Sequence, residues 1–487
     1  MTTMRKSQSA SIRKRLDHPI IDSDGHFVEF FPVVADHLKR VGGSDMVSRF
    51  ERAWNQTPLS RDWYDLSWEE RRDRRTVRPA FWNVSTRNTE DLATSILPDL
   101  LYERLDEMGL DFVVLYPGLG LICPHFADDE VRQATCRALN EMYAEVYTGF
   151  PDRMTPVATI PMHTPEEAIA ELEHAVGNLG LKGIVMPSFV PRPIPKVARE
   201  APEAAPYTGW MDSFGIDSPY DYDPVWAKCE ELKVLPTFHS SAMGWGSRTS
   251  ISNYVYNHIG HFATAQEAVC KALLLGGVTR RFPRLRFLFL EGGIGWGRNL
   301  YADALGHWRK RGREGLKAYD PANLDRTKLA ELFSRYGGKL IGDREITEGS
   351  ELFATVTGTA EDPTTLDEFA RCEIESDEDF RQLFLEPFYF GCEADDPITP
   401  SAFDVKANPL GARLNAVLGS DIGHWDVPDM SRVLEEAWEP VEEGLMSERD
   451  FRDFAFANAA RMWSALNPDF FKGTVVEGAV TDLLSNS

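Results

Sequence analysis

The segment Ile20–Phe27 combines acidic and imidazole side chains in a spacing that suits metal binding. Two β-branched residues precede polar residues at alternate positions, which is typical of a strand. Because side chains two apart on a strand share a face, we expect Asp22, Asp24 and His26 to point the same way. A carboxylate and an imidazole in this arrangement would supply half of a metal site. Asp-x-His also occurs at turns, so this interpretation depends on what the rest of the chain supplies.

Short apolar runs recur along the chain and alternate with helical patterns. Continuous apolar strands between helices are typical of a parallel sheet. Eight such units favour a closed (β/α)₈ TIM-type barrel. The alternative, an open doubly wound sheet, would normally carry a glycine-rich phosphate turn after the first strand, and the sequence lacks one. The predicted strands lie near residues 21, 113, 157, 184, 236, 288, 389 and 417.

Two long segments interrupt the barrel pattern. Residues 33–94 are polar and rich in tryptophan, and we interpret them as a long loop over the site, with helical surface decoration as the alternative. Residues 311–386 contain an acidic stretch, 361–379, which predicts a helical insertion with a solvated acidic face before strand seven. We divide the chain into a flexible basic tail, residues 1–18, and a single barrel domain, residues 19–487.

Composition narrows the possible partners. The formal charge is −24, from 76 acidic and 52 basic residues, which disfavours nucleic acid and anionic membranes. The six cysteines are scattered without a Cys-x-x-Cys pair, which favours free thiols in a reducing cytosol. No apolar run approaches the length of about 18 residues that a membrane span needs. We therefore expect a cytoplasmic protein with a small-molecule substrate.

Four of the predicted strands end in polar residues. Asp24 and His26 end the first strand, and His239 ends the fifth. Glu291 ends the sixth strand and Asp421 the eighth. Active sites of such barrels lie at this end of the strands. Mixed imidazole and carboxylate ligands suit one borderline divalent ion, Zn²⁺ first and Mn²⁺ or Fe²⁺ next, with an open position for water or substrate.

Motifs along nearly the whole chain are similar to those of a known family. They are Thr86–Thr89, Leu100–Asp106, Gly277–Arg286, Leu290–Trp296, Gly419–Asp426 and Asn458–Arg461. The chain resembles the amidohydrolase superfamily, specifically the amidohydrolase-related branch that includes aminocarboxymuconate semialdehyde decarboxylase and the resorcylate decarboxylases. The motifs are specific for the family and not for a substrate. The resemblance implies a homodimer or a higher homo-oligomer.

The resemblance also implies a ligand set. The family's strand-one His-x-His falls on Asp24 and His26, so the first ligand is a carboxylate. The strand-five ligand matches His239 and the strand-eight acid matches Asp421. The family's strand-six histidine falls on Glu291. Glu291 could do acid–base work, act as a further ligand or orient His239.

Four further residues are candidates for the site. His261, near the start of a helix, could replace the missing histidine in catalysis or could cap and pack the helix. His424, three residues after the strand-eight acid, could contact substrate or orient the acid. Glu29 could join the site or form a surface salt bridge. Arg87 could bind a substrate carboxylate or form a structural ion pair.

From these residues we predict a metal-dependent hydrolase. It would act on a small carbonyl- or carboxylate-bearing molecule through metal-activated water, with Asp421 as the proton acceptor and Glu291, His261 or His424 assisting. The glutamate on strand six favours hydrolysis. The alternative is a non-oxidative decarboxylase of an aromatic or muconate-like acid. A second alternative is a non-catalytic metal-binding barrel, against which the complete ligand set argues.

Overall fold

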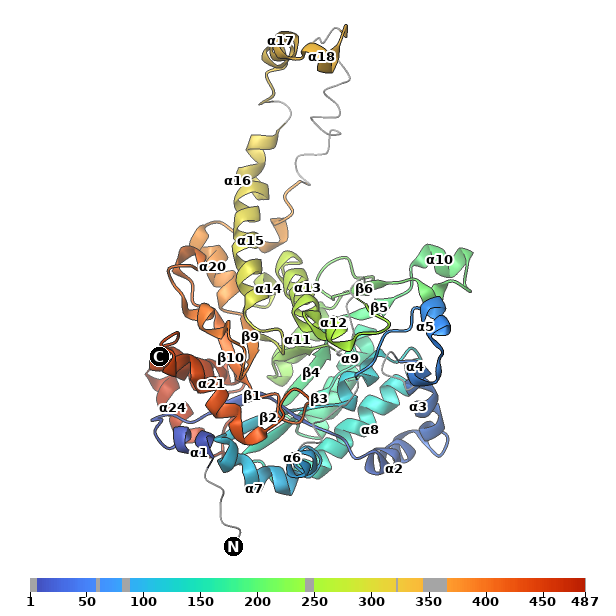
Figure 1. The fold of residues 1–487 in the computed structure, drawn as a ribbon, viewed down its shortest axis with the longest axis vertical. Helices are drawn as coiled ribbons and strands as arrows, with labels where there is room; N and C mark the ends of the chain where they lie inside the picture. Colours follow the sequence, from blue (N-terminus) through green and yellow to red (C-terminus); the bar gives the residue numbers. More distant parts are fainter. Residues whose placement is uncertain are drawn as a thin grey trace.

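The computed structural model is a barrel of parallel strands surrounded by helices (Figure 1). It describes residues 7–57, 62–80, 88–240, 249–320, 323–344 and 366–486. The eight strands follow one another in chain order, and each pairs in parallel with the next. They are β1 (Ile21–Phe27), β2 (Phe112–Pro117), β3 (Met154–Thr159), β4 (Gly183–Pro187), β7 (Pro236–His239), β8 (Phe287–Phe289), β9 (Phe388–Glu393) and β10 (Asn415–Gly419).

The first and last strands meet through the backbone that follows β10. The amide of Asp421 donates to the carbonyl of Asp24 (2.9 Å), and the amide of His26 donates to the carbonyl of Ile422 (2.7 Å). These bonds bring the two edges of the sheet together at the C-terminal end of the strands. All eight predicted strands and the predicted (β/α)₈ barrel are confirmed.

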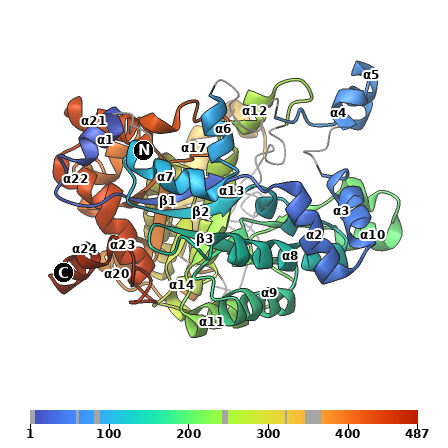
Figure 2. The same cartoon turned by 90° about the horizontal axis from the view of Figure 1, so that it is seen from below.

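An outer layer of helices covers the strands, and α8, α9 and α11 follow one another around the barrel (Figure 2). α9 begins as predicted, since Thr164 and Glu167 cap each other's backbone and Pro165 occupies the first turn. The main helices are α7 (Pro98–Met108), α8 (Asp129–Tyr147), α9 (Pro165–Leu172), α11 (Asp223–Leu232), α13 (His261–Leu275), α15 (Gly295–Arg311), α20 (Asp377–Leu385), α21 (Val433–Glu442) and α23 (Asn458–Ser464). Shorter elements are α10 (Pro195–Glu200), α12 (Tyr254–His258), α14 (Val278–Arg281), α22 (Glu448–Arg452), α24 (Glu477–Ser485) and the hairpin of β5 (Val190–Arg192) and β6 (Trp210–Asp212).

Apolar side chains form two cores on the two faces of the strands. One core lies between the strands and the outer helices, and the other fills the barrel interior. On β2, Val113 and Leu115 belong to the outer core, whereas Phe112 and Val114 belong to the inner one. This alternation follows from the two-residue period of a strand, which places successive side chains on opposite faces.

The chain after α23 covers the N-terminal end of the barrel. Trp463 stacks on Phe470 with ring centres 4.8 Å apart. The ring centre of Phe471 lies 5.3 Å from that of Phe112, at the start of β2. Lys182, just before β4, donates to the carbonyl of Phe470 (2.6 Å). This end of the barrel is therefore filled by side chains and leaves the opposite end for a site.

The first interruption of the barrel pattern is largely helical where the structure describes it. α2 buries Val34 and Leu38 and packs on α8, so this part of the segment joins the outer core of the barrel. Its described helices are α2 (Phe31–Gly42), α3 (Met46–Trp54), α4 (Asp62–Asp65), α5 (Trp68–Arg74) and α6 (Thr89–Thr94).

The second interruption leaves the barrel as an arm (Figure 1). α15 continues into α16 (Arg313–Leu316), and α17 (Arg326–Tyr336) and α18 (Gly338–Ile341) lie at the far end. The predicted acidic helix is partly confirmed: α20 has Asp377, Glu378 and Asp379 in its first turn, and residues 345–365 lie outside the described part.

The N-terminal segment departs from the prediction of a flexible tail. Residues 8–13 form helix α1 (Gln8–Arg13), which packs on α21 and buries Ile12. The hydroxyl of Ser9 accepts the amide of Glu435 (3.1 Å). For residues 8–13 the prediction was wrong, because Ser9, Ala10 and Ile12 form the buried side of a helix whose partner, α21, lies more than 400 residues later in the chain.

The remaining global expectations concern thiols and membranes. All six cysteines are free, as predicted, and the structure buries each of them. Within the described ranges, no helix combines the length and the hydropathy needed to cross a bilayer.

Candidate metal centre

An irregularity in β1 decides which of its polar residues reach the barrel mouth. The register with β2 shifts between Asp22 and Gly25. Asp22 is fully buried and accepts bonds from the amide (2.9 Å) and the hydroxyl of Ser420 and from the amide of Asp24 (3.1 Å). Asp22 therefore holds the end of β10, and the expectation that it shares a face with Asp24 and His26 is wrong. A shift in register by one residue reverses the face of the sheet to which each residue before the shift points.

Ligand-type atoms from the ends of four strands converge at the mouth. His26 Nε2 lies 3.3 Å from Asp24 Oδ1, 3.1 Å from Glu291 Oε1 and 3.5 Å from Asp421 Oδ1. His239 Nε2 lies 3.0 Å from Glu291 Oε1. The structure thus brings together all four predicted ligands and Glu291. Two overlapping sets have their donor atoms within 4.8 Å of one another: Asp24, His26, His239 and Glu291, and His26, Glu291, Asp421 and His424.

The state of these atoms fits a bound cation. Asp24 Oδ1, Glu291 Oε1 and Asp421 Oδ1, together with Nε2 of His26 and of His239, are buried and make no hydrogen bond within the described residues. A buried polar atom without a partner costs about 1–3 kcal/mol, so such atoms are rare unless a ligand satisfies them. His239 Nδ1 lies 2.9 Å from the carbonyl of Ser240, which keeps the proton on Nδ1 and frees the Nε2 lone pair.

The charges of the cluster also fit a bound cation. Within the described residues Asp24, Glu291 and Asp421 form ion pairs with histidines alone. Burial and the neighbouring Glu291 carboxylate raise the pKa of Asp421 well above its usual range. Burial lowers the pKa of His26, but Asp24 and Glu291 outweigh this and raise it to about 10. A proton on the imidazole supplies positive charge that a divalent cation would replace, since ligand histidines must be neutral.

Two of the clustered residues have strained backbones. Glu291 has φ 52° and Asp421 has φ 53°, in the left-handed region that favours glycine. Each follows the last residues of its strand, β8 or β10. A non-glycine residue held in this region costs on the order of 1 kcal/mol, and such strain concentrates at functional sites. The strain lets both carboxylates turn into the mouth.

His424 is the most accessible member of the cluster. Its ring stacks on His26 with centres 3.8 Å apart, and its side chain is 25% exposed. His424 Nδ1 lies 2.6 Å from Asp421 Oδ1 and 3.2 Å from Glu291 Oε1. Burial and the nearby His26 lower the pKa of His424. An imidazole between buried carboxylates and solvent is suited to moving protons.

The other candidates from the sequence lie elsewhere. His261 begins α13 and belongs to neither ligand set, and its Nε2 lies 2.6 Å from the hydroxyl of Ser240. Glu29 is buried and accepts three backbone amides that follow β2 (2.9–3.2 Å) and the hydroxyl of Tyr143 (2.7 Å). Glu29 therefore anchors that loop, and neither of its predicted roles is right. Arg87 lies outside the described residues.

Sequence reasoning missed an aromatic group beside the ligands. Phe262 lies edge-on to His239, with ring centres 5.6 Å apart. The ring centre of His258 lies 5.3 Å from that of Phe262 and 5.4 Å from that of Trp425. The ring centre of Tyr254 lies 5.8 Å from that of Trp425. Tyr254 and His258 lie four residues apart on α12, and Phe262 lies in the first turn of α13; their four-residue spacing in the sequence would have been the signal.

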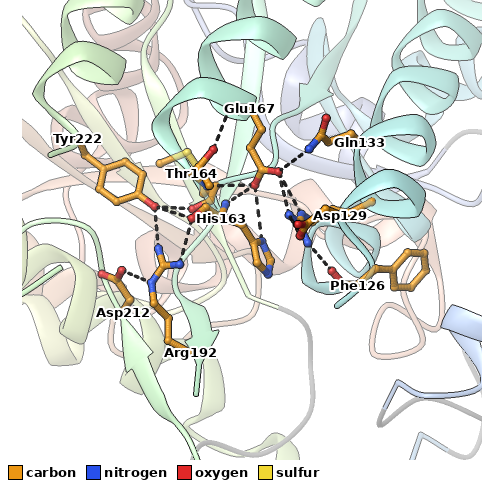
Figure 3. Close-up of polar contacts among 11 residues, drawn as sticks. Phe126, Asp129, Gln133, His163, Thr164, Glu167, Arg192, Asp212 and Tyr222 are labelled. Carbon is orange, nitrogen blue, oxygen red and sulfur yellow. Dashed lines mark hydrogen bonds and ion pairs between the residues drawn. The ribbon is translucent and has the colours of Figure 1, made fainter. Parts of the chain in front are cut away.

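A second polar cluster lies near the ends of β3 and β4 (Figure 3). Arg192 bonds to Asp212 (2.6 Å), to the hydroxyl of Tyr222 (2.9 Å) and to the carbonyl of His163 (3.0 Å). Glu167 receives a bond from Gln133 (3.3 Å), and burial lowers the pKa of His163 to about 2. Arg192 links Asp212, Tyr222 and the backbone of His163 across several loops, so this cluster braces the barrel.

With this geometry in hand, comparison with known proteins identifies the class. Residues 21–338 match the family model described as Amidohydrolase, and the chain belongs to the amidohydrolase family. It is therefore an enzyme of the amidohydrolase superfamily, and the non-catalytic alternative is set aside.

Individual relatives differ in reaction. The chain is 27% identical over 276 residues to 2-keto-4-carboxy-3-hexenedioate hydratase from Sphingobium sp. (strain SYK-6), which covers 54% of this chain and 70% of the hydratase. It is 24% identical over 196 residues to 2-amino-3-carboxymuconate-6-semialdehyde decarboxylase from Dictyostelium discoideum, covering 40% of this chain and about half (48%) of the decarboxylase. The structure of an amidohydrolase from Mycobacterium avium subsp. paratuberculosis K-10 is similar in fold, with TM-score 0.50, 18% identity and coverage of 92% of this chain and 100% of that one.

Proposed function

We propose that the protein is a metal-dependent, non-oxidative decarboxylase of a small aromatic or muconate-like acid. The observation that carries this proposal is the two overlapping ligand sets at the barrel mouth, in which five buried ligand atoms make no hydrogen bond within the described residues, beside the partly exposed imidazole of His424. The relation to the Dictyostelium decarboxylase supports this reaction over the hydrolysis that the sequence alone favoured. Zn²⁺ suits the mixed donor set best, and Mn²⁺ or Fe²⁺ next.

Asp24, His26, His239 and Asp421 would hold the cation, and Glu291 would be a fifth ligand. Glu291 Oε1 lies 3.1 Å from His26 Nε2 and 3.0 Å from His239 Nε2, so the three atoms could bind the same ion. An oxygen in that position would bind the ion and would not act on a substrate carbon. In our proposal the strand-six residue of this chain is therefore a ligand, and the acid role passes to another side chain.

His424 is the residue we assign to proton transfer. A bound divalent cation would take oxygens of the substrate and draw electron density from the bond that breaks. Loss of CO₂ breaks a carbon–carbon bond and leaves its electron pair on the substrate carbon, which must then receive a proton. His424 can deliver this proton because its ring is partly exposed, and Asp421, 2.6 Å from Nδ1, would orient it.

The longer match to the hydratase favours hydration as a second candidate. Addition of water to a carbon–carbon double bond also ends with a proton delivered to carbon, so His424 would serve the same role. The attacking water would give a proton to Asp421. Hydration and decarboxylation therefore use one site and differ in the bond that the substrate presents.

The test is product analysis on metal-loaded protein. The substrates are salicylate-like acids, a carboxymuconate semialdehyde and an unsaturated keto diacid, with amides as the probe for hydrolysis. We expect metal-dependent CO₂ release from one of the acids. The variant His424→Asn should lose this turnover and keep its metal, whereas His307→Asn on the exposed side of α15 should keep both. Incorporation of ¹⁸O from water without CO₂ release would select hydration, and amide cleavage alone would overturn both proposals.

A further inference from the structure

The arm that projects from the barrel has almost no core of its own. From residue 313 to residue 344, Ile341 is the one buried residue among those that the structure describes. α17 is 11 residues long and buries none of them. Isolated helices shorter than about 12–15 residues are marginal in water, because packing supplies most helical stability in proteins. The tip of the arm therefore needs a partner surface.

The tip presents a pattern suited to packing. Leu329, Leu332 and Tyr336 recur at helical spacing along α17, and Leu340 follows on α18. The exposed fractions are 44% for Leu332, 69% for Tyr336 and 84% for Leu340. Large apolar side chains gathered on one exposed helical side mark an interaction surface.

The charge of the tip is opposite to that of the rest of the chain. Residues 323–344 carry five basic and three acidic residues, a net charge of +2, whereas the remaining residues of the chain carry −26. Another copy of the same chain therefore offers the tip an acidic surface. Complementary charge of this kind selects partners and speeds their encounter.

A groove at the base of the arm has the matching character. It has a volume of about 860 Å³ and lies between α13, α15 and residues 367–371. Its apolar lining includes Leu275, Trp296 and Phe369. Its acidic lining includes Asp217 and Asp303, which form no ion pair within the described residues. α17 and α18 lie at the far end of the arm, away from α13 and the start of α15 (Figure 1).

We propose that two copies of this chain exchange their arms about a two-fold axis, so that the arm tip of each protomer occupies the groove of its partner. Leu332, Tyr336 and Leu340 pack on the apolar lining, and Lys328 and Lys339 face Asp217 and Asp303 of the partner subunit. A two-fold axis repeats each contact, so both tips and both grooves are filled and the assembly closes. The surface does not involve the metal ligands, so this inference is independent of the proposed reaction.

The first experiment measures the mass of the full chain in solution across a dilution series, by sedimentation or light scattering. We expect a dimer for the native sequence. Tyr336→Glu with Leu340→Glu should raise the dimer dissociation constant by about 30-fold or more, as expected when central apolar anchors are lost. Tyr207→Glu, at an 89% exposed position outside the arm and groove, is the matched control and should leave it unchanged. An unchanged far-UV circular dichroism spectrum would show that the variants are folded.

The second experiment tests the pairing of tip and groove. Lys328→Glu with Lys339→Glu, and separately Asp217→Lys with Asp303→Lys, should each weaken the dimer, and the four changes together should restore it. A mixture of Leu340→Cys and Asp303→Cys proteins should form disulfide-linked dimers that neither forms alone, because the six native cysteines are buried. A monomeric native protein, a dimer indifferent to the tip variants, or charge reversals that fail to rescue each other would overturn the proposal.

Discussion

At the C-terminal end of the barrel, polar atoms from four strands are buried without hydrogen bonds, whereas at the N-terminal end the same strands meet aromatic rings. Trp463 is 2% exposed and packs on Phe470, and the ammonium of Lys182 donates to a backbone carbonyl there. The carboxylates of Glu291 and Asp421, by contrast, are held in strained conformations at the other end.

This difference separates stability from chemistry within one fold. Apolar packing at the N-terminal end contributes free energy of folding, since burial of a large side chain stabilises by about 1.5–3 kcal/mol. At the C-terminal end, backbone strain and buried like charges lower the stability of the folded state. Substitutions at the two ends should therefore affect different measurements, and the following expectations are ways to test that separation.

The largest effect should follow Asp421→Asn. Asparagine keeps the size of the side chain and tolerates the left-handed backbone, so the fold should persist. Loss of the carboxylate would remove a proposed ligand and the group proposed to orient His424, so we expect turnover to fall by about 1000-fold or more. The free energy of unfolding of the metal-free protein should change by less than about 1 kcal/mol, because a buried repulsion is removed as well. Steady-state kinetics and urea unfolding measure the two quantities, and full activity would contradict the role of Asp421.

Trp463→Ala should show the reverse behaviour. Removing a buried tryptophan from the N-terminal end leaves a cavity and should cost about 3–5 kcal/mol of stability. The metal content per folded chain should stay that of the native protein, since the ring lies with Phe470 at the opposite end from the ligands. Thermal unfolding and elemental analysis are the measurements. A loss of metal from still-folded protein would break the separation between the two ends.

Removal of the metal should destabilise the protein through the C-terminal end alone. A ligand that binds the native state at about 100 times its dissociation constant stabilises it by about 2.7 kcal/mol. Chelation should lower the unfolding temperature and abolish turnover, and added Zn²⁺ or Mn²⁺ should restore both. His239→Ala should already behave like the chelated protein and gain nothing from added metal. An equal response to metal in His239→Ala would refute the assignment of that ligand.

Gly419→Ala should weaken metal binding without a change of ligand. A Cβ at this position would lie 2.8 Å from Asp24 Cβ, so the carboxylate must move. Loss of support behind a ligand typically lowers metal affinity by 10–100-fold. Gly149→Ala is the matched control, because nothing lies within 4 Å of its added Cβ. Competition with a metal-binding dye gives the dissociation constants, and equal values in the two variants would show that this close approach is unimportant.

The smallest effect concerns pH at the N-terminal end. Burial lowers the pKa of Lys182 to about 8 from an ordinary value of 10.5. Between these values the unfolded chain binds more protons than the folded one, so Lys182 makes stability rise with pH across this window, by at most about 1.4 kcal/mol per unit. Lys182→Met should flatten this rise. Urea unfolding at pH 7.5, 8.5 and 9.5 measures it, and parallel curves for the two proteins would contradict the assignment.

Much of this molecule was predictable because the signals are local. Each barrel strand is a continuous apolar run, and the residues that end four of them, among them His239 and Asp421, are polar. The capping box at Thr164 and Glu167 likewise needs no more than a few neighbouring residues. Strand order then followed from chain order, since parallel barrels place successive strands side by side.

Other features depend on contacts between distant segments. The register shift that turns Asp22 toward Ser420 exists because β1 must fit both β2 and β10. The directions of the Glu29 and His261 side chains likewise depend on hydrogen-bond partners, Tyr143 and Ser240. No spacing in the sequence indicates these partners.

The sequence by itself therefore determined the strands, the barrel and the residue types at its mouth, since these follow from hydrophobic periodicity and strand ends. Only the tertiary structure decided which polar side chains converge: it placed Glu291 between His26 and His239 and left His424 accessible beside Asp421. It also ordered α1 and projected α17 away from the barrel. The physical reason is that orientation and pairing are set by packing against segments hundreds of residues away, which a local pattern does not contain.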